Sequence, residues 1–196
     1  DVKMMNVLTG FKFISEEIEK FHETKESTFL FGYEESFGYL IGDFVRDKDA
    51  VQASVLIAEA AARYKEKGLT LLDGLDALYE EYGYYQEALE SLTLKGKSGM
   101  AEIEKIMQYF GSDDFLKEFP ETIAVVEDYS TGKVVNHETG TTKQLDFPTS
   151  NVLKYITPDN SWFCIRPSGT EPKIKFYFAV KGETKTESDT LLINMK

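Results

Sequence analysis

The chain has 196 residues, of which 42% are hydrophobic and 13% aromatic, enough to build a buried core in one large domain or two small ones. Lys and Arg number 22 against 34 Asp and Glu, so the net charge is −12. A surface this acidic repels nucleic acid and anionic membranes, and no apolar run approaches the length of a membrane span, so neither is expected as a partner. A single cysteine, Cys164, excludes an internal disulfide and predicts a reducing, cytoplasmic location.

The first half of the chain is dominated by helical patterns. The strongest is alanine-rich, with Asp49 at its start and Gly68 at its stop. Before it, the apolar run Thr28–Phe31 predicts a short strand that leads into a polar loop flanked by Gly32 and Gly38. Helices are expected over residues 15–23, 49–68, 70–83 and 98–110, and an extended segment over residues 88–94.

The second half changes character near residues 111–120. Short runs of β-type residues, separated by turn residues, follow one another up to a final helix at residues 186–196. Strands are expected over residues 122–129, 133–138, 151–156, 162–167 and 173–180. The change from helix-rich to strand-rich sequence predicts two domains, 1–112 and 113–196.

The stretch "IRPSGTEPKIKFY", residues 165–177, has the chemistry of an anion socket. Arg166 supplies a cationic fork, Ser168 and Thr170 supply hydroxyls, and Gly169 allows close backbone approach. The segment from Arg166 to Lys175 holds three cations and one acid, whereas acids outnumber cations in the chain as a whole. The alternative is a strand-to-strand turn, because Ser, Gly and Pro are also the usual turn residues. Chemistry alone leaves both hypotheses open.

The stretch "FGYEESFGY", residues 31–39, carries a carboxylate and a hydroxyl close together. Glu34 and Ser36 would share a face of an extended segment, where they can hold vicinal hydroxyls such as those of a sugar ring. The alternative is a solvated strand-to-helix loop without a ligand.

Taken together, these stretches resemble a known family. "GYEESFGY" resembles the sugar-binding loop of the α-D-phosphohexomutases, and "RPSGTEP" resembles the phosphate-binding loop of their last domain. "VLTGFKFI" and "VRDKDAV" resemble the segments around the sugar loop in the phosphoglucomutase branch. The phosphoserine loop and the magnesium loop of the family's first two domains have no match here. The chain therefore resembles domains three and four: an α/β domain at 1–112, truncated at its N-terminus, then a small α+β domain at 113–196 with an antiparallel sheet and helices on one face.

The resemblance implies a phosphorylated sugar as ligand and assigns roles residue by residue. Glu34, Ser36 and Gly32 match the sugar-binding loop. Thr9, Gly10 and Lys12 match a further loop near the substrate. The residues that match the grip on the non-transferred phosphate are Arg166, Ser168, Gly169, Thr170 and Lys175.

Lys48 matches a lysine proposed in relatives as a proton shuttle, although its spacing from the loop is one residue longer than in the animal-type enzyme, and an exposed lysine at a helix start is the alternative. The whole enzyme would move a phosphoryl group between the 1- and 6-positions of a hexose through a phosphoserine and a bisphosphate. It would use magnesium and a glucose 1,6-bisphosphate activator, and no residue here is expected to bind a metal.

The missing N-terminal domains of the same chain are therefore expected partners, and the fragment alone is expected to be inactive. A phosphopentomutase, which resembles the same loops, and a non-catalytic phosphosugar- or peptide-binding module remain as alternatives.

Overall fold

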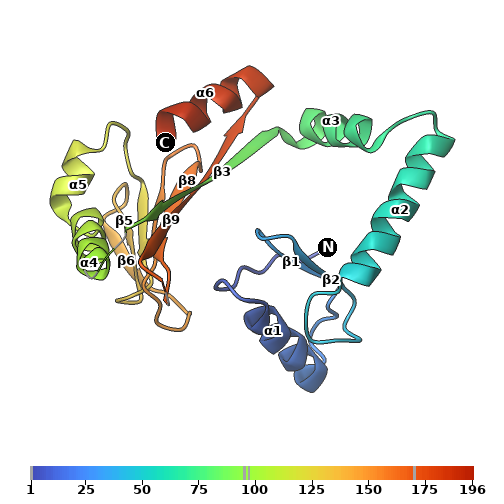
Figure 1. Ribbon diagram of the computed structural model, residues 1–196, viewed down its shortest axis with the longest axis horizontal. Helices are drawn as coiled ribbons and strands as arrows, with labels where there is room; N and C mark the ends of the chain where they lie inside the picture. Colours follow the sequence, from blue (N-terminus) through green and yellow to red (C-terminus); the bar gives the residue numbers. More distant parts are fainter. Residues whose placement is uncertain (1, 95, 97, 170) are drawn as a thin grey trace. The chain divides into compact units, whose positions relative to one another are not determined.

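The structure is a computed structural model that describes residues 2–94, 96, 98–169 and 171–196. The chain forms two compact units, Asp1–Ala77 and Leu78–Lys196 (Figure 1). The first unit contains α1 (Phe11–Thr24), β1 (Phe31–Glu34), β2 (Gly38–Ile41), α2 (Ala50–Glu66) and the start of α3 (Leu71–Tyr82).

In the first unit, a small core forms between α1 and the hairpin of β1 and β2. Phe11, Ile14 and Ile18 are spaced three and four residues apart, so they lie on one face of α1, and they pack with Leu40 of β2. The helix begins four residues earlier than the expected start at Ser15, because Phe11 extends the buried stripe by one turn. Ser15 lies inside the helix, where its hydroxyl donates to the Phe11 carbonyl at 3.1 Å.

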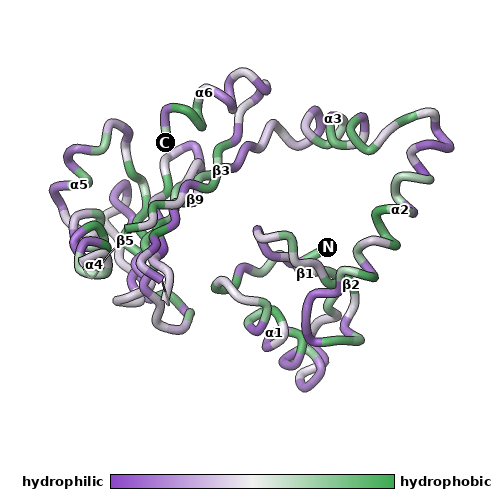
Figure 2. Tube along the Cα trace, in the orientation of Figure 1, coloured by the Kyte–Doolittle hydropathy of each residue, from purple (hydrophilic) through white to green (hydrophobic). Residues whose placement is uncertain are grey.

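The expected helix over residues 49–68 is confirmed as α2, and its cap explains where it starts. The Asp49 carboxylate accepts hydrogen bonds from the backbone N–H groups of Val51 and Gln52 at 2.9 and 3.0 Å. The Gln52 side chain in turn bridges the backbone of Ile41 and ties the helix to β2. No described residue of α2 is buried, and its apolar residues are visible along the helix in Figure 2.

The described strands of the second unit form one antiparallel sheet in the order β3-β9-β8-β7-β4-β5-β6. Its elements are β3 (Tyr84–Thr93), α4 (Gly99–Phe110), α5 (Asp113–Glu118), β4 (Val125–Asp128), β5 (Lys133–Asn136), β6 (Thr141–Gln144), β7 (Leu153–Ile156), β8 (Trp162–Pro167), β9 (Lys173–Gly182) and α6 (Lys185–Met195).

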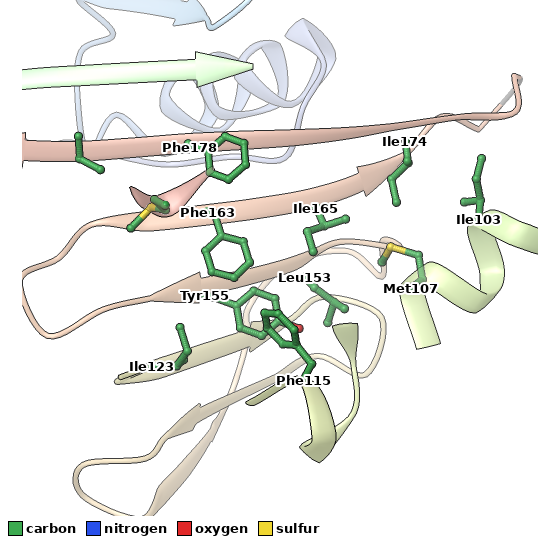
Figure 3. Close-up of a cluster of buried hydrophobic side chains, with 12 residues drawn as sticks. Ile103, Met107, Phe115, Ile123, Leu153, Tyr155, Phe163, Ile165, Ile174 and Phe178 are labelled. Carbon is green, nitrogen blue, oxygen red and sulfur yellow. The ribbon is translucent and has the colours of Figure 1, made fainter. Parts of the chain in front are cut away.

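One face of this sheet carries the main core. Tyr155 of β7 and Phe163 of β8 stack with ring centroids 4.7 Å apart, beside Phe115 of α5 (Figure 3). Every second residue of β8 and β9 points the same way, and the helices cover this face. The other buried members of the cluster are Ile103, Met107, Ile123, Leu153, Ile165, Ile174, Phe178, Val180 and Met195.

The compact units divide between Ala77 and Leu78, whereas the sequence predicts a domain boundary between residues 112 and 113. The reason is pairing over a long sequence separation. All ten residues of β3 pair with β9, and Ile103 and Met107 of α4 belong to the same core as the sheet. Residues 84–110 therefore join the strand-rich unit, although they precede the change in sequence character near residues 111–120.

Candidate functional site

The predicted sugar loop is a β-hairpin. Glu34 ends β1 and lies opposite Gly38 in β2, with the turn at residues 35–37 between them. The strand begins at Phe31, not at Thr28, and Ser36 lies in the turn. The expectation that Glu34 and Ser36 share a strand face is therefore wrong.

Phe37, not a glycine, takes the positive φ that the reversal requires, at 64°. A bulky residue in the left-handed region is strained, and this one is 85% exposed at the tip of the loop.

Glu34 is held beside Lys48. The side chain of Glu34 is 11% exposed, and the Lys48 Nζ lies 3.5 Å from its Oε2. Gly38 makes this arrangement possible, because a Cβ at that position would lie 2.6 Å from the Lys48 Cδ and 2.8 Å from the Glu34 Oε2. The lysine thus crosses the space that any other residue would fill, which is a requirement for glycine that the sequence analysis did not identify.

The same pair sets the protonation of Lys48. The Glu34 carboxylate is the main cause that raises the pKa of Lys48, and the Asp47 carboxylate adds to it. The Lys48 Nζ also lies 5.6 Å from the centre of the Phe11 ring. At neutral pH Lys48 therefore carries its proton, and in this state it can donate a proton but not accept one.

Two hollows on the first unit gather most of the predicted residues there. A cavity of about 650 Å³ is lined by Thr9, Gly10, Gly32 and Glu34 among others. A second hollow of about 660 Å³ is lined in part by Lys12 and Lys48.

Gly32 has a packing role as well, since a Cβ there would lie 2.9 Å from the Ile14 Cγ2 and from the Phe29 Cζ. Gly10 stands just before α1 with a φ of 126° that L side chains rarely adopt.

The predicted phosphate loop connects β8 and β9 in the second unit. Ser168 donates its backbone N–H to the Lys173 carbonyl at 2.7 Å, and its hydroxyl accepts the Glu171 N–H at 3.3 Å. Gly169 is exposed, and a Cβ built there would meet nothing within 4 Å. Thr170 lies outside the described residues. The space beside Gly169 is thus open for a ligand, and the packing of the protein itself does not require glycine there.

Two cations face each other across the strands at this loop. Arg166 and Lys175 are direct partners in the register of β8 and β9, so both side chains lie on the sheet face opposite the core. Like charges directly opposite destabilise a sheet, and among the described residues neither cation has an ion-pair partner. An anion between them would remove this repulsion.

The guanidinium of Arg166 is only partly satisfied. Its Nη2 donates to the Tyr177 hydroxyl at 3.1 Å, but its Nε is buried without a hydrogen-bond partner among the described residues. Buried donors are nearly always paired, and an unpaired one costs about 1–3 kcal/mol. Within the described part of the chain this nitrogen is therefore a donor without an acceptor.

Across the described residues, no group of three or more His, Cys, Asp and Glu side chains is arranged to hold a metal ion. The described residues thus offer no fitting site for a resident metal. No helix in the described ranges combines the length and apolar character that crossing a membrane requires.

Comparison with known families decides what these loops belong to. Residues 1–82 match the model of the phosphoglucomutase/phosphomannomutase alpha/beta/alpha domain III, and residues 92–189 match the model of the C-terminal domain of the same family. The chain belongs to the phosphoglucomutase/phosphomannomutase family. The resemblance inferred from the two loops is confirmed, as is the fold class of an α/β domain followed by an α+β domain.

The family relatives agree in name and differ in length from this chain. A phosphoglucomutase from Staphylococcus aureus (strain MRSA252) is 41% identical over 181 residues, which cover 92% of this chain and 32% of the relative. One from Staphylococcus saprophyticus is 36% identical over 187 residues, or 95% of this chain and 34% of the relative. The chain thus spans about a third of the length of the curated relatives that it matches.

A solved structure in the same family has the same fold. It is the open form of the exocytosis-sensitive phosphoprotein pp63/parafusin, a phosphoglucomutase, from Paramecium. The TM-score is 0.62 at 18% identity, over 95% of this chain and 31% of that one. At this identity the likeness supports the fold alone.

Sequence reasoning missed Phe37 and Tyr177, and it named Gly38 only as a flank of the loop, without its role beside Lys48. Tyr177 had a usable signal, because it lies two residues after Lys175 in a predicted strand and so shares its face. The packing role of Gly38 and the conformation of Phe37 had no such signal, since the space that Lys48 occupies and the positive φ at the turn both depend on how the hairpin folds.

Proposed function

We propose that this chain is the ligand-holding part of a phosphoglucomutase, which interconverts glucose 1-phosphate and glucose 6-phosphate through a phosphoserine enzyme and a bisphosphate intermediate. The named relatives support the reaction class, since those at 41% and 36% identity are phosphoglucomutases. The bisphosphate must turn around between the two half-reactions, so the ligand-holding part has to accept the sugar in two orientations.

One observation carries the phosphate part of this proposal. Arg166 and Lys175 oppose each other without ion-pair partners among the described residues, and the Arg166 Nε is buried and unpaired. A phosphate between them would accept charge-assisted hydrogen bonds from both cations, which are about twice as strong as neutral ones. Ser168, Gly169 and Thr170 would complete the grip from the loop, as the family resemblance implies.

The sugar part of the proposal rests on Glu34 and Ser36. The Glu34 carboxylate is held by Lys48 at the edge of a cavity that Gly32, Thr9 and Gly10 also line. A carboxylate and a hydroxyl can hold two neighbouring ring hydroxyls in either orientation of the sugar, because vicinal hydroxyls present similar donor and acceptor pairs.

Lys48 is charged at neutral pH and therefore carries a proton to donate, and its position matches the proton shuttle of the family. The Glu34 carboxylate, which raises the pKa of Lys48, makes it a weaker acid, so proton transfer would require a ligand that weakens this pair. In this role it would protonate a sugar oxygen as the phosphoryl group leaves it. Lys12 lines the same hollow as Lys48 and would add positive charge near the ligand.

The other components of the reaction would come from the rest of the enzyme. Domains that precede these two would supply the phosphoserine, bind magnesium and respond to glucose 1,6-bisphosphate. The apolar residues of α2, such as Val51 at 76% and Val55 at 64% exposed, offer those domains a surface to cover. The cytoplasmic location stays a prediction from cysteine usage.

The test of the proposal is anion binding by the chain itself. Inorganic phosphate should shift the amide resonances of Ser168 and Gly169 and leave residues 28–38 unmoved. Arg166→Ala should move these shifts to clearly higher phosphate concentrations, and Arg166→Lys should recover the affinity only in part, because an ammonium group lacks the bidentate fork. If the shifts are the same in wild type and in Arg166→Ala, the loop is only a turn.

The purified chain should not convert glucose 1-phosphate, even with magnesium and bisphosphate, since phosphoryl transfer needs a positioned nucleophile and a cation. Measurable conversion by the chain would contradict this division of labour.

A further inference from the structure

Tyr177 is the described neighbour that fixes the guanidinium of Arg166. It lies on β9 two residues beyond Lys175, which is the direct register partner of Arg166. This makes Tyr177 the diagonal neighbour of Arg166, a position that long and aromatic side chains reach. Its hydroxyl accepts a hydrogen bond from the Arg166 Nη2 at 3.1 Å, and its ring centre lies 6.0 Å from the guanidinium carbon.

This contact uses one donor of the fork and leaves others free. A guanidinium carries five N–H donors in one plane, so a single hydrogen bond to a rigid partner restricts the orientation of all of them. Tyr177 is rigid because it lies in the middle of β9, paired with Cys164 of β8 and Leu89 of β3. The unpaired Arg166 Nε is consequently held in one direction before any ligand arrives.

We propose that Tyr177 is a positioning residue for anion binding: it pre-orients the Arg166 fork so that the N–H groups that this contact leaves free face a phosphate at the β8–β9 loop. Tyr177 acts through Arg166 and does not itself touch the anion. A pre-oriented side chain loses less rotamer freedom on binding than a mobile one, and the affinity is higher for that reason. This inference rests on the proposed function of Arg166 as a phosphate ligand.

The experiment is a double-mutant cycle on phosphate affinity in the 196-residue chain. Inorganic phosphate is titrated into wild type, Tyr177→Phe, Arg166→Ala and the double variant, with the amide shifts of Ser168 and Gly169 as readout. Tyr177→Phe keeps the ring and removes only the hydroxyl, so the fold is retained, and a thermal melt checks this.

Tyr85→Phe is the matched control. It removes a tyrosine hydroxyl from the same sheet face, since Tyr85 on β3 pairs with Lys181 of β9 and its ring contacts that lysine.

We expect Tyr177→Phe to raise the phosphate Kd roughly three- to tenfold, because this change in affinity corresponds to the loss of one hydrogen bond of ordinary net strength. Tyr85→Phe should leave the Kd unchanged. In the Arg166→Ala background, Tyr177→Phe should have no further effect, because the tyrosine then has nothing to position. The Arg166 Nε–Hε resonance should be sharp in wild type and broadened in Tyr177→Phe, a signature that general destabilisation would not give.

Each other outcome overturns a distinct part of the argument. If Arg166→Ala weakens binding but Tyr177→Phe behaves like Tyr85→Phe, the proposed function stands and the positioning role of Tyr177 is wrong. If Tyr177→Phe weakens binding equally with and without Arg166, the tyrosine contacts the anion itself. If neither variant weakens binding, both the grip and its positioning residue are refuted.

Discussion

Gly38→Ala should separate the Glu34–Lys48 pair without unfolding the chain. The added Cβ would lie 2.6 Å from the Lys48 Cδ and 2.8 Å from the Glu34 Oε2, whereas ordinary contacts between non-bonded atoms are near 3.5–4.0 Å. Each side chain must therefore retreat by roughly 1 Å, and the 3.5 Å contact between Nζ and Oε2 is lost.

The stability cost of this substitution should be small. The Lys48 side chain is half exposed, and exposed ion pairs contribute about 0–1 kcal/mol. Gly38 is not among the glycines with positive φ, so alanine fits its backbone and restricts the unfolded chain, which stabilises by about 0.4–1 kcal/mol. The two effects oppose each other, and the free energy of unfolding should change by less than about 1 kcal/mol.

The pKa of Lys48 gives the decisive readout. Because the Glu34 carboxylate is the main cause of its raised value, Gly38→Ala should lower the pKa of Lys48 toward 10.5, as measured by NMR titration of the lysine side chain. Glu34→Gln is the positive control, and Gly169→Ala, where the added Cβ meets nothing within 4 Å, is the negative control. A Lys48 pKa that stays raised in Gly38→Ala would refute the steric argument.

Three further outcomes follow from the same structure. Gly169→Ala should leave the free energy of unfolding unchanged or raise it by up to about 1 kcal/mol, which denaturation measures. The same substitution should weaken phosphate binding, because its Cβ enters the space through which an anion approaches the backbone. A phosphate titration that gives an unchanged Kd would contradict this second expectation. Because the pKa of Lys48 is raised, its pairing with Glu34 stabilises the fold below pH 10.5, and this stabilisation is lost as the pH rises through the pKa of the folded state. Between about pH 9 and about pH 12, the free energy of unfolding should therefore fall more steeply with pH in wild type than in Glu34→Gln. Parallel curves for the two proteins would argue against the pair. Phe163→Ala should lower the free energy of unfolding in urea by about 3–5 kcal/mol, because the ring is 3% exposed in the core. Trp162→Ala, on the opposite face of the sheet, should lower it clearly less, and equal losses would contradict a core on one face only.

The local features of this protein could be predicted from its sequence. The helix α2 and its Asp49 cap follow from composition and capping chemistry, and the strands of the second unit follow from short β-type runs between turn residues. The family was recognised because the residue types and the order of two loops resemble it, and the comparisons confirm that family. Each of these signals is local, since it depends on residues within a few positions of one another.

Tertiary structure decided the rest, because it depends on which distant segments pair. The β3–β9 ladder places residues 84–110 in the second unit, although they precede the change in sequence character near residues 111–120. The register of β8 and β9 sets Arg166 opposite Lys175 and brings Tyr177 to the guanidinium, and a shift of one residue would move these side chains to the other face. Gly38 is needed only because Lys48, ten positions later, folds back across it to reach Glu34. Composition and periodicity record none of these encounters, since a residue's own propensity says nothing about the partner that it meets across a sheet or a hairpin.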